Sequence, residues 1–455
     1  MGWNLENTYM KLPERFYRRQ RPIASPAPNV VAFNGELGSD LGLNPDELRG
    51  GEVLAGNMLP EGANPIAQAY AGYQFGHFSM LGDGRAVLLG EQITPKNAKF
   101  DIQLKGAGPT PFSRGGDGFA ALSPMLREFI ISEAMHALEI PTTRSLAVIK
   151  TGRDVIREKV LQGAVLTRVA SSHIRVGTFN YAAAYGSAED VAALADYGIL
   201  RHFPHLAVDN DKYLMFLQTV IQKQATLIAK WQLAGFVHGV MNTDNMAISG
   251  ETIDYGPCAF LDVYNADGVF SSIDRTGRYA YKNQPHMAVW NLCRFAESLL
   301  PLLDENRERA IEAAKSEIEG FWGCFEEYWL DGMRAKLGLE DKEAVDSDIF
   351  KELLDLMQTH RLDYANTLYL LAHGEKIDKL ADWQEKWRER GVRQGCTPAV
   401  IPRNHKVEEA LAAAESGDFE VMERLLEALR KPYEYSTEYA EPPRSCGKYV
   451  TFCGT

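Results

Sequence analysis

Cysteine is scarce in this sequence, and its spacing is not that of a metal site. The six cysteines of the 455-residue chain are widely spread, and no Cys-x-x-Cys pair occurs. Structural zinc sites and the disulfide scaffolds of small secreted domains both require several cysteines at short spacings. The sequence therefore argues against a zinc protein and against a secreted protein held together by disulfides.

Long apolar segments and an excess of basic residues are also missing. No apolar run approaches the roughly 18 residues that cross a bilayer, and residues 1–20 contain no apolar stretch of a signal peptide. The 61 acidic residues outnumber the 48 basic ones, so general binding to nucleic acid or to an anionic membrane is not expected. We predict a cytoplasmic protein with no nucleic-acid or membrane partner.

The predicted elements change type along the chain. Alternation of apolar and polar residues predicts strands at residues 70–80, 85–93, 100–105, 145–150 and 163–170. Apolar residues at helical spacing predict helices at residues 123–138, 213–233, 287–303 and 310–337, and a helical hairpin at 404–430. A β-rich part followed by a helical part is the order of a protein kinase. The predicted fold class is therefore α+β, with a protein-kinase-like bilobal fold.

The predicted division of the chain has four parts. They are an N-terminal extension packed on the lobes (1–65), a β-rich N-lobe (66–185), a helical C-lobe with the catalytic and metal loop (186–340), and a helical C-terminal extension with a Cys-bearing tail (341–455). Many α+β proteins share this order, so the order alone is weak evidence for a kinase-like fold.

Local features add detail to these predictions. Asp83-Gly84 predicts a hairpin turn between the first two strands. Ser123 and Pro124 predict the cap and the first position of the first helix. The tryptophans expected in the core of the helical part are Trp290, Trp322 and Trp329.

One cluster in the helical part carries the strongest indication of chemistry. The stretch from His238 to Asn245 has the length of a kinase catalytic loop, and Asp254 begins a counterpart of the kinase Asp-Phe-Gly motif. Asn245 and Asp254 then occupy the two metal-ligand positions. The position of the usual kinase base is Val240, whereas Asp244 directly precedes the metal-binding Asn.

This pattern predicts a nucleotide enzyme on a kinase scaffold that does not carry out ordinary kinase chemistry. Asp244 is the candidate general base, and Asn245 and Asp254 are candidate ligands of Mg²⁺. The alternative for Asp244-Asn245 is a turn or cap pair, where these residue types are common. His238 is expected to orient the loop rather than to react.

Basic side chains that suit phosphate lie in the β-rich part. Lys105 ends an alternating strand, and Glu128 on the next helix is preferred over Glu133 as its ion-pair partner. Arg168 and Arg175 are expected to converge on phosphate, because guanidinium groups bind it in a bidentate manner that Lys does not match. The alternative for Lys105 and Glu128 is an ordinary surface charge, and the alternative for each arginine is a surface charge or an ion-pair partner.

Two glycine-rich loops are further candidates for phosphate binding. They are Gly82-Asp83-Gly84-Arg85 and Gly115-Gly116-Asp117-Gly118. Glycine lets backbone amides approach phosphate oxygens closely. Each loop is weak evidence alone, and the first is equally explained as a hairpin turn.

Taken together, these motifs resemble those of the selenoprotein O family of pseudokinases, known in bacteria as YdiU proteins. The resemblance runs from about residue 5 to the C-terminus. The motifs that carry it are Leu81-Gly82-Asp83-Gly84-Arg85, residues 103–108, Gly116-Asp117-Gly118, residues 166–170, residues 238–246 and residues 254–257. Several independent matches in the same order make a chance similarity improbable.

The resemblance implies an enzyme that moves AMP from ATP to Ser, Thr or Tyr hydroxyls of proteins and releases pyrophosphate. Members of this family bind ATP in the reverse orientation to kinases, with the γ-phosphate buried and the α-phosphate facing the acceptor. The implied cofactor is Mg²⁺ or Mn²⁺, the co-substrate is ATP, and UTP is an alternative donor. The implied acceptors are proteins, redox proteins among them, and the enzyme itself.

The resemblance also implies roles for single residues. The residues implied to hold the β- and γ-phosphates are Lys105, Arg168 and Arg175, with Glu128 paired to Lys105. The other implied nucleotide contacts are Gly82, Gly84, Arg85, Asp117 and Gly118. The implied base is Asp244, and the implied metal ligands are Asn245 and Asp254.

The C-terminal tail departs from part of the family. Some members close a disulfide from this tail to the segment after Asp-Tyr-Gly. Here Cys453 stands third from the end, while residues 268–272 contain no cysteine. Pairing of Cys453 with Cys446, with Cys258 or with neither stays open.

Two other functions fit the residues. Val240 in place of the usual base is consistent with a non-catalytic ATP-binding scaffold. The kinase-like metal positions are also consistent with an enzyme that transfers the γ-phosphate.

Overall fold

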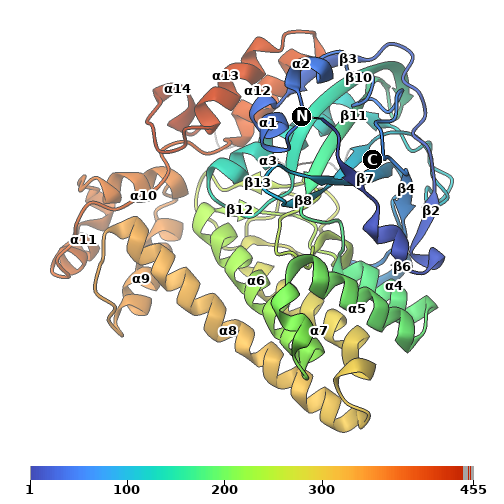
Figure 1. Cartoon of the computed structure of the whole chain (residues 1–455). Coiled ribbons are helices and arrows are strands. Elements are labelled where there is room, and N and C mark those ends of the chain that lie inside the picture. The colour runs from blue at the N-terminus through green and yellow to red at the C-terminus, as the bar shows by residue number, and fades with distance from the viewer. Residues whose placement is uncertain (1, 444–448, 450, 452–455) are drawn as a thin grey trace.

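The computed structural model describes residues 2–443, 449 and 451. Strands gather in the first 170 residues, and the long helices follow them (Figure 1). The predicted α+β class is confirmed. Among the described helices, none has the length and apolar character needed to cross a bilayer.

A nine-stranded antiparallel sheet forms the β-rich part. Its path runs β2-β4-β7-β8-β11-β10-β3, with β1 paired to β7 and β9 paired to β11. The strands are β1 (Leu5–Glu6), β2 (Tyr17–Arg19), β3 (Asn29–Phe33), β4 (Ile66–Gln68), β7 (Ala86–Ile93), β8 (Lys99–Lys105), β9 (Ala120–Ala121), β10 (Arg144–Ile156) and β11 (Val160–Ala170). Three of these strands come from the first 65 residues, so the N-terminal segment is part of the sheet.

Strand β8 lies in the middle of this sheet and shows the predicted alternation. Ile102 and Leu104 belong to a core beneath the sheet, which α1 (Gly35–Asp40) and α2 (Pro45–Leu48) help to close. Gln103 and Lys105 point to the other face, where they are buried as well. Both faces of the sheet are therefore covered, and the polar face of β8 opens into a site rather than into solvent.

The predicted hairpin around Asp83-Gly84 is wrong. Residues 70–80 contain two strands, β5 (Ala71–Gln74) and β6 (His77–Met80), which pair with each other. Strand β7 pairs with β8 instead. The turn of the true hairpin is at Phe75 and Gly76, both with positive φ (50° and 89°), and a phenylalanine gives no sequence signal for such a turn.

Helix α3 (Leu122–Ala137) packs across β10 and β11. It begins two residues earlier than predicted from the cap, with Ala121 rather than Ser123 at the cap position and no side-chain cap, so Ser123 and Pro124 lie inside its first turn. Nearly every residue of its middle is buried, because α12 (Asn404–Glu415) and α13 (Glu420–Leu429) cover its outer side (Figure 1). The predicted helical hairpin at 404–430 is confirmed.

From α4 onward the chain is mostly helical. The described helices here are α4 (Val176–Tyr185), α5 (Ala188–His202), α6 (Lys212–Ala234), α7 (Gln284–Leu303), α8 (Arg307–Leu337), α9 (Asp346–Thr359), α10 (Tyr364–Ala372), α11 (Ala381–Arg388) and α14 (Thr437–Ala440). Helices α6, α7 and α8 pack against one another. A short ladder of β12 (Phe236–Val237) and β13 (Ala259–Phe260) follows α6 and frames the segment that contains residues 238–257.

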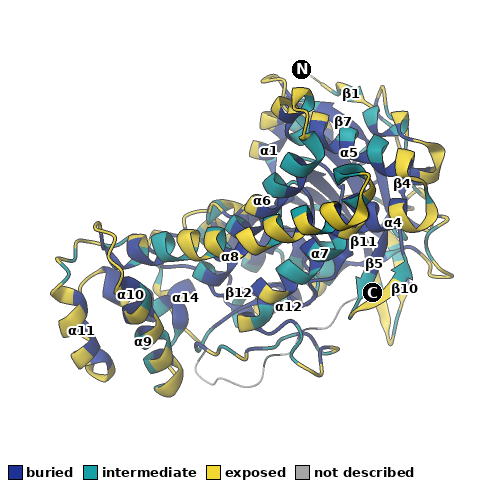
Figure 2. Ribbon diagram, turned by 90° about the horizontal axis from the view of Figure 1, so that it is seen from below, coloured by how far each residue is buried: buried dark blue, intermediate teal, exposed yellow. Residues whose placement is uncertain are grey.

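The outer face of α8 is exposed along much of its length (Figure 2). Trp322 lies on this face with 38% of its surface exposed, so its predicted place in the core is wrong. Trp290 and Trp329 are partly buried and pack against the two cores of the helical part. A helix of 31 residues covers its neighbours with only one face, and sequence spacing alone did not separate the two faces.

Candidate active site

A central cleft of about 510 Å³ lies between the sheet and the helical part. All of the predicted site residues line it, from both parts of the chain: Gly82, Gly84, Arg85, Lys105, Asp117, Gly118, Glu128, Arg168, Arg175, Asp244, Asn245 and Asp254. Residues up to 172 positions apart in the sequence are thus brought to one place, which composition and local pattern alone do not require.

Lys105 and Arg168 form the buried floor of the central cleft. Lys105 comes from the end of β8 and Arg168 from the neighbouring strand β11. The Nζ of Lys105 lies 2.5 Å from Oε2 of Glu128 and 2.7 Å from Oδ1 of Asp254. The Nη1 of Arg168 lies 2.6 Å from the same Oδ1 and 3.2 Å from Oε1 of Glu128. Two cations and two carboxylates therefore form one buried cluster.

Glu128, rather than Glu133, is the acid on α3 that meets Lys105. Glu133 lies toward the other end of the helix and is bound there by Arg144, with Oε1 accepting from Nε at 2.9 Å. It also accepts hydrogen bonds from the side chain of Asn34 and the amide of Ser145. Its contacts hold α3 to β10 and lie outside the central cleft.

Arg175 adds a third cation to the cluster. It precedes α4, and its Nη1 donates to Oδ2 of Asp254 at 2.8 Å and to the main-chain oxygen of Asp244 at 2.9 Å. Its guanidinium carbon lies 4.5 Å from the centre of the Tyr70 ring. This stack fixes the plane of the guanidinium, since cations favour the face of an aromatic ring.

Asp254 is the shared acceptor of the three cations. Its backbone has a φ of 63°, in the left-handed region that Asp tolerates better than most residues. Burial alone would raise the pKa of Asp254, but Lys105, Arg168 and Arg175 hold it well below its usual range. The carboxylate is therefore ionised at every physiological pH.

The loop from His238 to Asn245 is held by its own polar side chains. The Nε2 of His238 donates to the carbonyl of Ile253 at 2.9 Å, and its ring stacks on Trp231 at 5.4 Å between centres. His238 is fully buried and orients the loop, as predicted. The Nδ2 of Asn245, a residue that lines the central cleft, donates to the carbonyl of Val240 at 2.9 Å, so its Oδ1 is left to accept.

Asp244 lies beside the cation cluster and is 7% exposed. Among the described residues, its Oδ1 has no hydrogen-bond partner. Burial raises the pKa of Asp244 to about 6. A Cβ atom added at Gly72 would lie 2.1 Å from Oδ1 of Asp244, so strand β5 needs glycine where it passes this carboxylate.

Four residues that the sequence analysis did not assign position the predicted ones. Asp83 accepts hydrogen bonds from the amide of Gln68 at 3.0 Å and from Nε2 of Gln103 at 3.1 Å. Gln103 in turn accepts from Nη2 of Arg168 at 2.6 Å. On the other side, Thr243 and Asn242 accept the amides of Tyr73 and Phe75 from the β5–β6 hairpin. The position of Asp83 between two glycines was the one available sequence signal.

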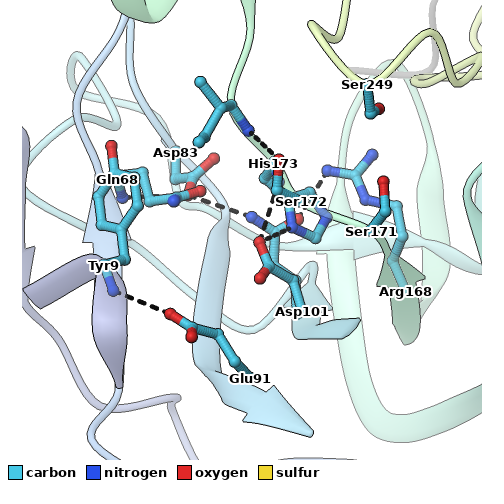
Figure 3. A network of polar contacts seen from close by, with 12 residues as sticks. Tyr9, Gln68, Asp83, Glu91, Asp101, Arg168, Ser171, Ser172, His173 and Ser249 are labelled. Atoms are coloured by element: carbon cyan, nitrogen blue, oxygen red, sulfur yellow. Dashed lines mark hydrogen bonds and ion pairs between the residues drawn. The ribbon is translucent and has the colours of Figure 1, made fainter. Parts of the chain in front are cut away.

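A polar network around Asp101 of β8 fixes the segment between Arg168 and Arg175 (Figure 3). Oδ2 of Asp101 accepts from the amide of His173 at 2.9 Å and from its Nδ1 at 3.0 Å. Arg201 also binds Asp101, with Nη2 to Oδ1 at 2.9 Å. Burial lowers the pKa of His173 to about 4, so the imidazole ring is neutral at physiological pH.

The glycine-rich loops form the mouth of the central cleft. Gly82 has a φ of 94°, and a Cβ there would lie 2.5 Å from Cγ of Phe112. Gly118 has a φ of 69° and would place a Cβ 2.2 Å from the carbonyl carbon of Gly108. Both positions therefore require glycine. Asp117 forms an ion pair with Arg157 at 2.8 Å, in which the hydrogen bond from Arg157 lowers the pKa of Asp117.

The open question of the tail disulfide concerns Cys258, Cys446 and Cys453. Cys258 is buried and forms no disulfide with any described residue, and burial raises its pKa to about 12. Cys446 and Cys453, on which the open question of the tail disulfide depends, lie outside the described residues. Thr451 is described, and its main-chain oxygen accepts the amide of Ser272 at 3.0 Å.

Curated proteins of known class resemble the chain over its whole length. A protein of Geobacillus kaustophilus (strain HTA426) named "Protein nucleotidyltransferase YdiU" is 57% identical over 481 aligned residues, covering 100% of this chain and 99% of that protein. Proteins of the same name from Anoxybacillus flavithermus (strain DSM 21510 / WK1) and Brevibacillus brevis (strain 47 / JCM 6285 / NBRC 100599) are 58% and 57% identical, covering 100% of this chain and 99% and 98% of those proteins.

The α+β fold, the central cleft and these similarities define an enzyme of the protein nucleotidyltransferase class. The sequence model of the family described as "Protein adenylyltransferase SelO" matches residues 1–393. The chain belongs to the SelO family. The resemblance inferred from the motifs is therefore confirmed.

Proposed function

We propose that the central cleft binds ATP with its triphosphate tail innermost and transfers AMP to a hydroxyl of a protein. In this proposal Lys105, Arg168 and Arg175 hold the β- and γ-phosphates. The convergence of these three buried cations on one carboxylate is the observation that carries the proposal. The glycine-rich mouth, with Gly82, Gly84, Arg85, Asp117 and Gly118, contacts the rest of the nucleotide.

The balance of charges in the central cleft supports a triphosphate tail that points inward. The three cations share two carboxylates, those of Glu128 and Asp254. If Asp254 turns to a metal ion, the cations keep only Glu128 and need another anion in the same buried space. A triphosphate tail supplies that anion. The same cations then stabilise the pyrophosphate that leaves, because its charge grows where they already lie.

Asn245 and Asp254 are the proposed ligands of Mg²⁺ or Mn²⁺. No group of three or more His, Cys, Asp or Glu side chains suited to a metal occurs within the described part of the chain. Two protein oxygens fit Mg²⁺, which is commonly bound by one or two protein ligands together with phosphates and water. The fixed amide of Asn245 and the ionised carboxylate of Asp254 supply such oxygens. The bound ion would neutralise charge on the phosphates.

Asp244 is the proposed general base. A Ser, Thr or Tyr hydroxyl attacks the α-phosphorus, the bond from this phosphorus to the bridging oxygen of the β-phosphate breaks, and the hydroxyl proton passes to Asp244. A pKa of about 6 leaves the carboxylate largely ionised at neutral pH, while its basicity exceeds that of an ordinary Asp. Because Val240 occupies the position of the usual kinase base, that position supplies no carboxylate.

The proposal also covers the division into lobes and the location of the protein in the cell. We propose that the sheet with α3 corresponds to a kinase N-lobe, to which the extension at 1–65 adds three strands. The helices from α4 onward would correspond to a C-lobe, with a second extension at 341–455. The reaction would take place in the cytoplasm, where ATP is formed. Its acceptors would include the enzyme itself and redox proteins, and UTP would serve as a second donor.

Parallel assays with two differently labelled ATP molecules test the proposed function. The purified protein is incubated with Mg²⁺ and either α-³²P-ATP or γ-³²P-ATP, and labelled protein is separated by gel electrophoresis. Label from the α position alone is the expected result. Label from the γ position alone would show a phosphotransferase. ATP binding without any label, unchanged in Asp244→Ala, would show a non-catalytic scaffold. Replacing ATP with α-³²P-UTP tests the second donor.

A further inference from the structure

An open groove continues from the mouth of the central cleft. Phe75 and Ile273 line both the cleft and the groove. Beyond them, the charged or titratable side chains on the groove are Arg275, Arg278 and His286, and none of its described lining residues is acidic. In a chain with 61 acidic and 48 basic residues, this surface has the opposite sign to the protein as a whole.

Arg278 has hydrogen-bonding capacity that the described structure does not use. Its guanidinium carbon lies 4.9 Å from the centre of the Trp290 ring, and its Nε and Nη2 atoms are buried without a partner among the described residues. The neighbouring Asp274 does not use these donors, because its carboxylate instead accepts the main-chain amides of Arg278 at 3.0 Å and Tyr279 at 2.8 Å. A guanidinium with unused donors is suited to a carboxylate.

The walls of the groove are fixed relative to the proposed base. The Oδ1 of Asn242 accepts from the amide of Phe75 at 3.1 Å and from the hydroxyl of Tyr279 at 2.5 Å. Asn242 lies two residues before Asp244, so one side chain links both walls to the loop of the base. A chain bound in the groove is thereby held in a defined position next to the reaction site.

We propose that this groove binds the acceptor segment of the protein substrate and selects hydroxyls that have Asp or Glu residues nearby in sequence. The inference rests on the proposed function and specifies its substrate class. Acidic side chains of the bound segment pair with Arg275 and Arg278. Apolar parts of the segment contact Phe75 and Ile273, where the groove meets the cleft.

The test compares two synthetic peptides under α-³²P-ATP and Mg²⁺. Both contain one tyrosine, flanked by glutamates in the first peptide and by glutamines in the second. The expected result is a higher kcat/KM for the glutamate peptide, with the difference lost at high salt because exposed charges are screened. In Arg275→Glu, KM for the glutamate peptide should rise about fivefold, the scale of one exposed ion pair, while KM for ATP stays unchanged.

Arg275→Glu is the main variant because Arg275 is exposed, and substitutions of exposed side chains usually change stability little. Arg278→Gln removes the guanidinium that stacks on Trp290. It should raise KM for the glutamate peptide more than Arg275→Glu does. The matched control is Arg307→Glu, an exposed arginine at the start of α8, which should leave both peptides unaffected.

The outcomes separate this inference from the function on which it rests. If the wild-type enzyme labels no protein and no peptide from α-³²P-ATP, the proposed function itself fails. If it labels both peptides with equal kcat/KM and Arg275→Glu changes neither, the groove does not select acidic acceptors, while the nucleotidyl transfer stands.

Discussion

Nη1 of Arg175 lies 2.9 Å from the main-chain oxygen of Asp244, to which it donates a hydrogen bond. The same nitrogen lies 2.8 Å from Oδ2 of Asp254. The side chain proposed to hold phosphate therefore also fixes the loop that carries the proposed base. In the proposed function, binding of the nucleotide and placement of the base would therefore depend on one guanidinium group.

Arg175→Lys should impair both steps at once. Lysine keeps the charge but lacks the planar fork that contacts two acceptors and stacks on Tyr70. We expect KM for ATP to rise and kcat to fall, each by about tenfold, the effect of roughly 1.4 kcal/mol. Steady-state labelling with α-³²P-ATP measures both constants. Arg309→Lys, on the surface of α8, is the control. A change in KM with normal kcat would contradict the link to the base.

Two acids on α3 should differ in their effects. Glu128→Gln removes the carboxylate that Lys105 and Arg168 share, so we expect KM for ATP to rise about tenfold. Glu133→Gln disturbs the contacts with Arg144 and should lower stability in urea while KM for ATP changes less than about twofold. Equal kinetic effects of the two variants would mean that Glu128 has no special part in the site.

The activity should depend on the ionisation of Asp244. Its pKa is raised to about 6 by burial, so the basic form is lost as the pH falls through about 6 rather than through 3.8. We expect kcat/KM to decrease tenfold for each pH unit below about 5.5. Asp83 is the necessary control because burial also raises its pKa to about 6. Asp83→Asn should keep the decrease, and a profile that is flat to pH 5 in the wild type would exclude Asp244 as the base.

Asp244 should also lower the stability of the folded protein. Because its folded pKa lies above the ordinary 3.8, the ionised carboxylate disfavours folding above about pH 6 and has no effect below the unfolded pKa. The displacement corresponds to roughly 3 kcal/mol. Asp244→Asn should therefore raise the free energy of unfolding at pH 7.5 and leave it nearly unchanged at pH 3.5. Urea unfolding at the two pH values measures this, and a variant less stable at pH 7.5 would contradict it.

Local sequence patterns predicted the strands and helices in which apolar residues recur at one regular spacing. The alternation around Ile102 and Leu104 located β8, and the long apolar-periodic stretches located α6, α7 and α8. The spacing from His238 to Asn245 and Asp254 identified the residues that meet in the central cleft. In each case the signal lies within a few turns or within one motif, where the chain's own geometry determines the neighbours.

Features that depend on distant partners were not predicted. Strand β7 pairs with β8 across a sheet, and nothing near Asp83 indicates that partner. The turn at Phe75 is held by Asn242, 167 residues away. The support of Arg168 by Gln103 and Asp83 likewise needs three segments to be in place. Such contacts follow from the tertiary fold, so they override local propensity.

A crystal structure with α,β-methylene-ATP and Mg²⁺ tests the orientation of the nucleotide most directly, since this analogue is not cleaved between the α- and β-phosphates. We expect the γ-phosphate at the cleft floor, in contact with Lys105 and Arg175, and the α-phosphate facing Asp244. A γ-phosphate that points to solvent, with adenosine at the cleft floor, would show that the proposed orientation is wrong.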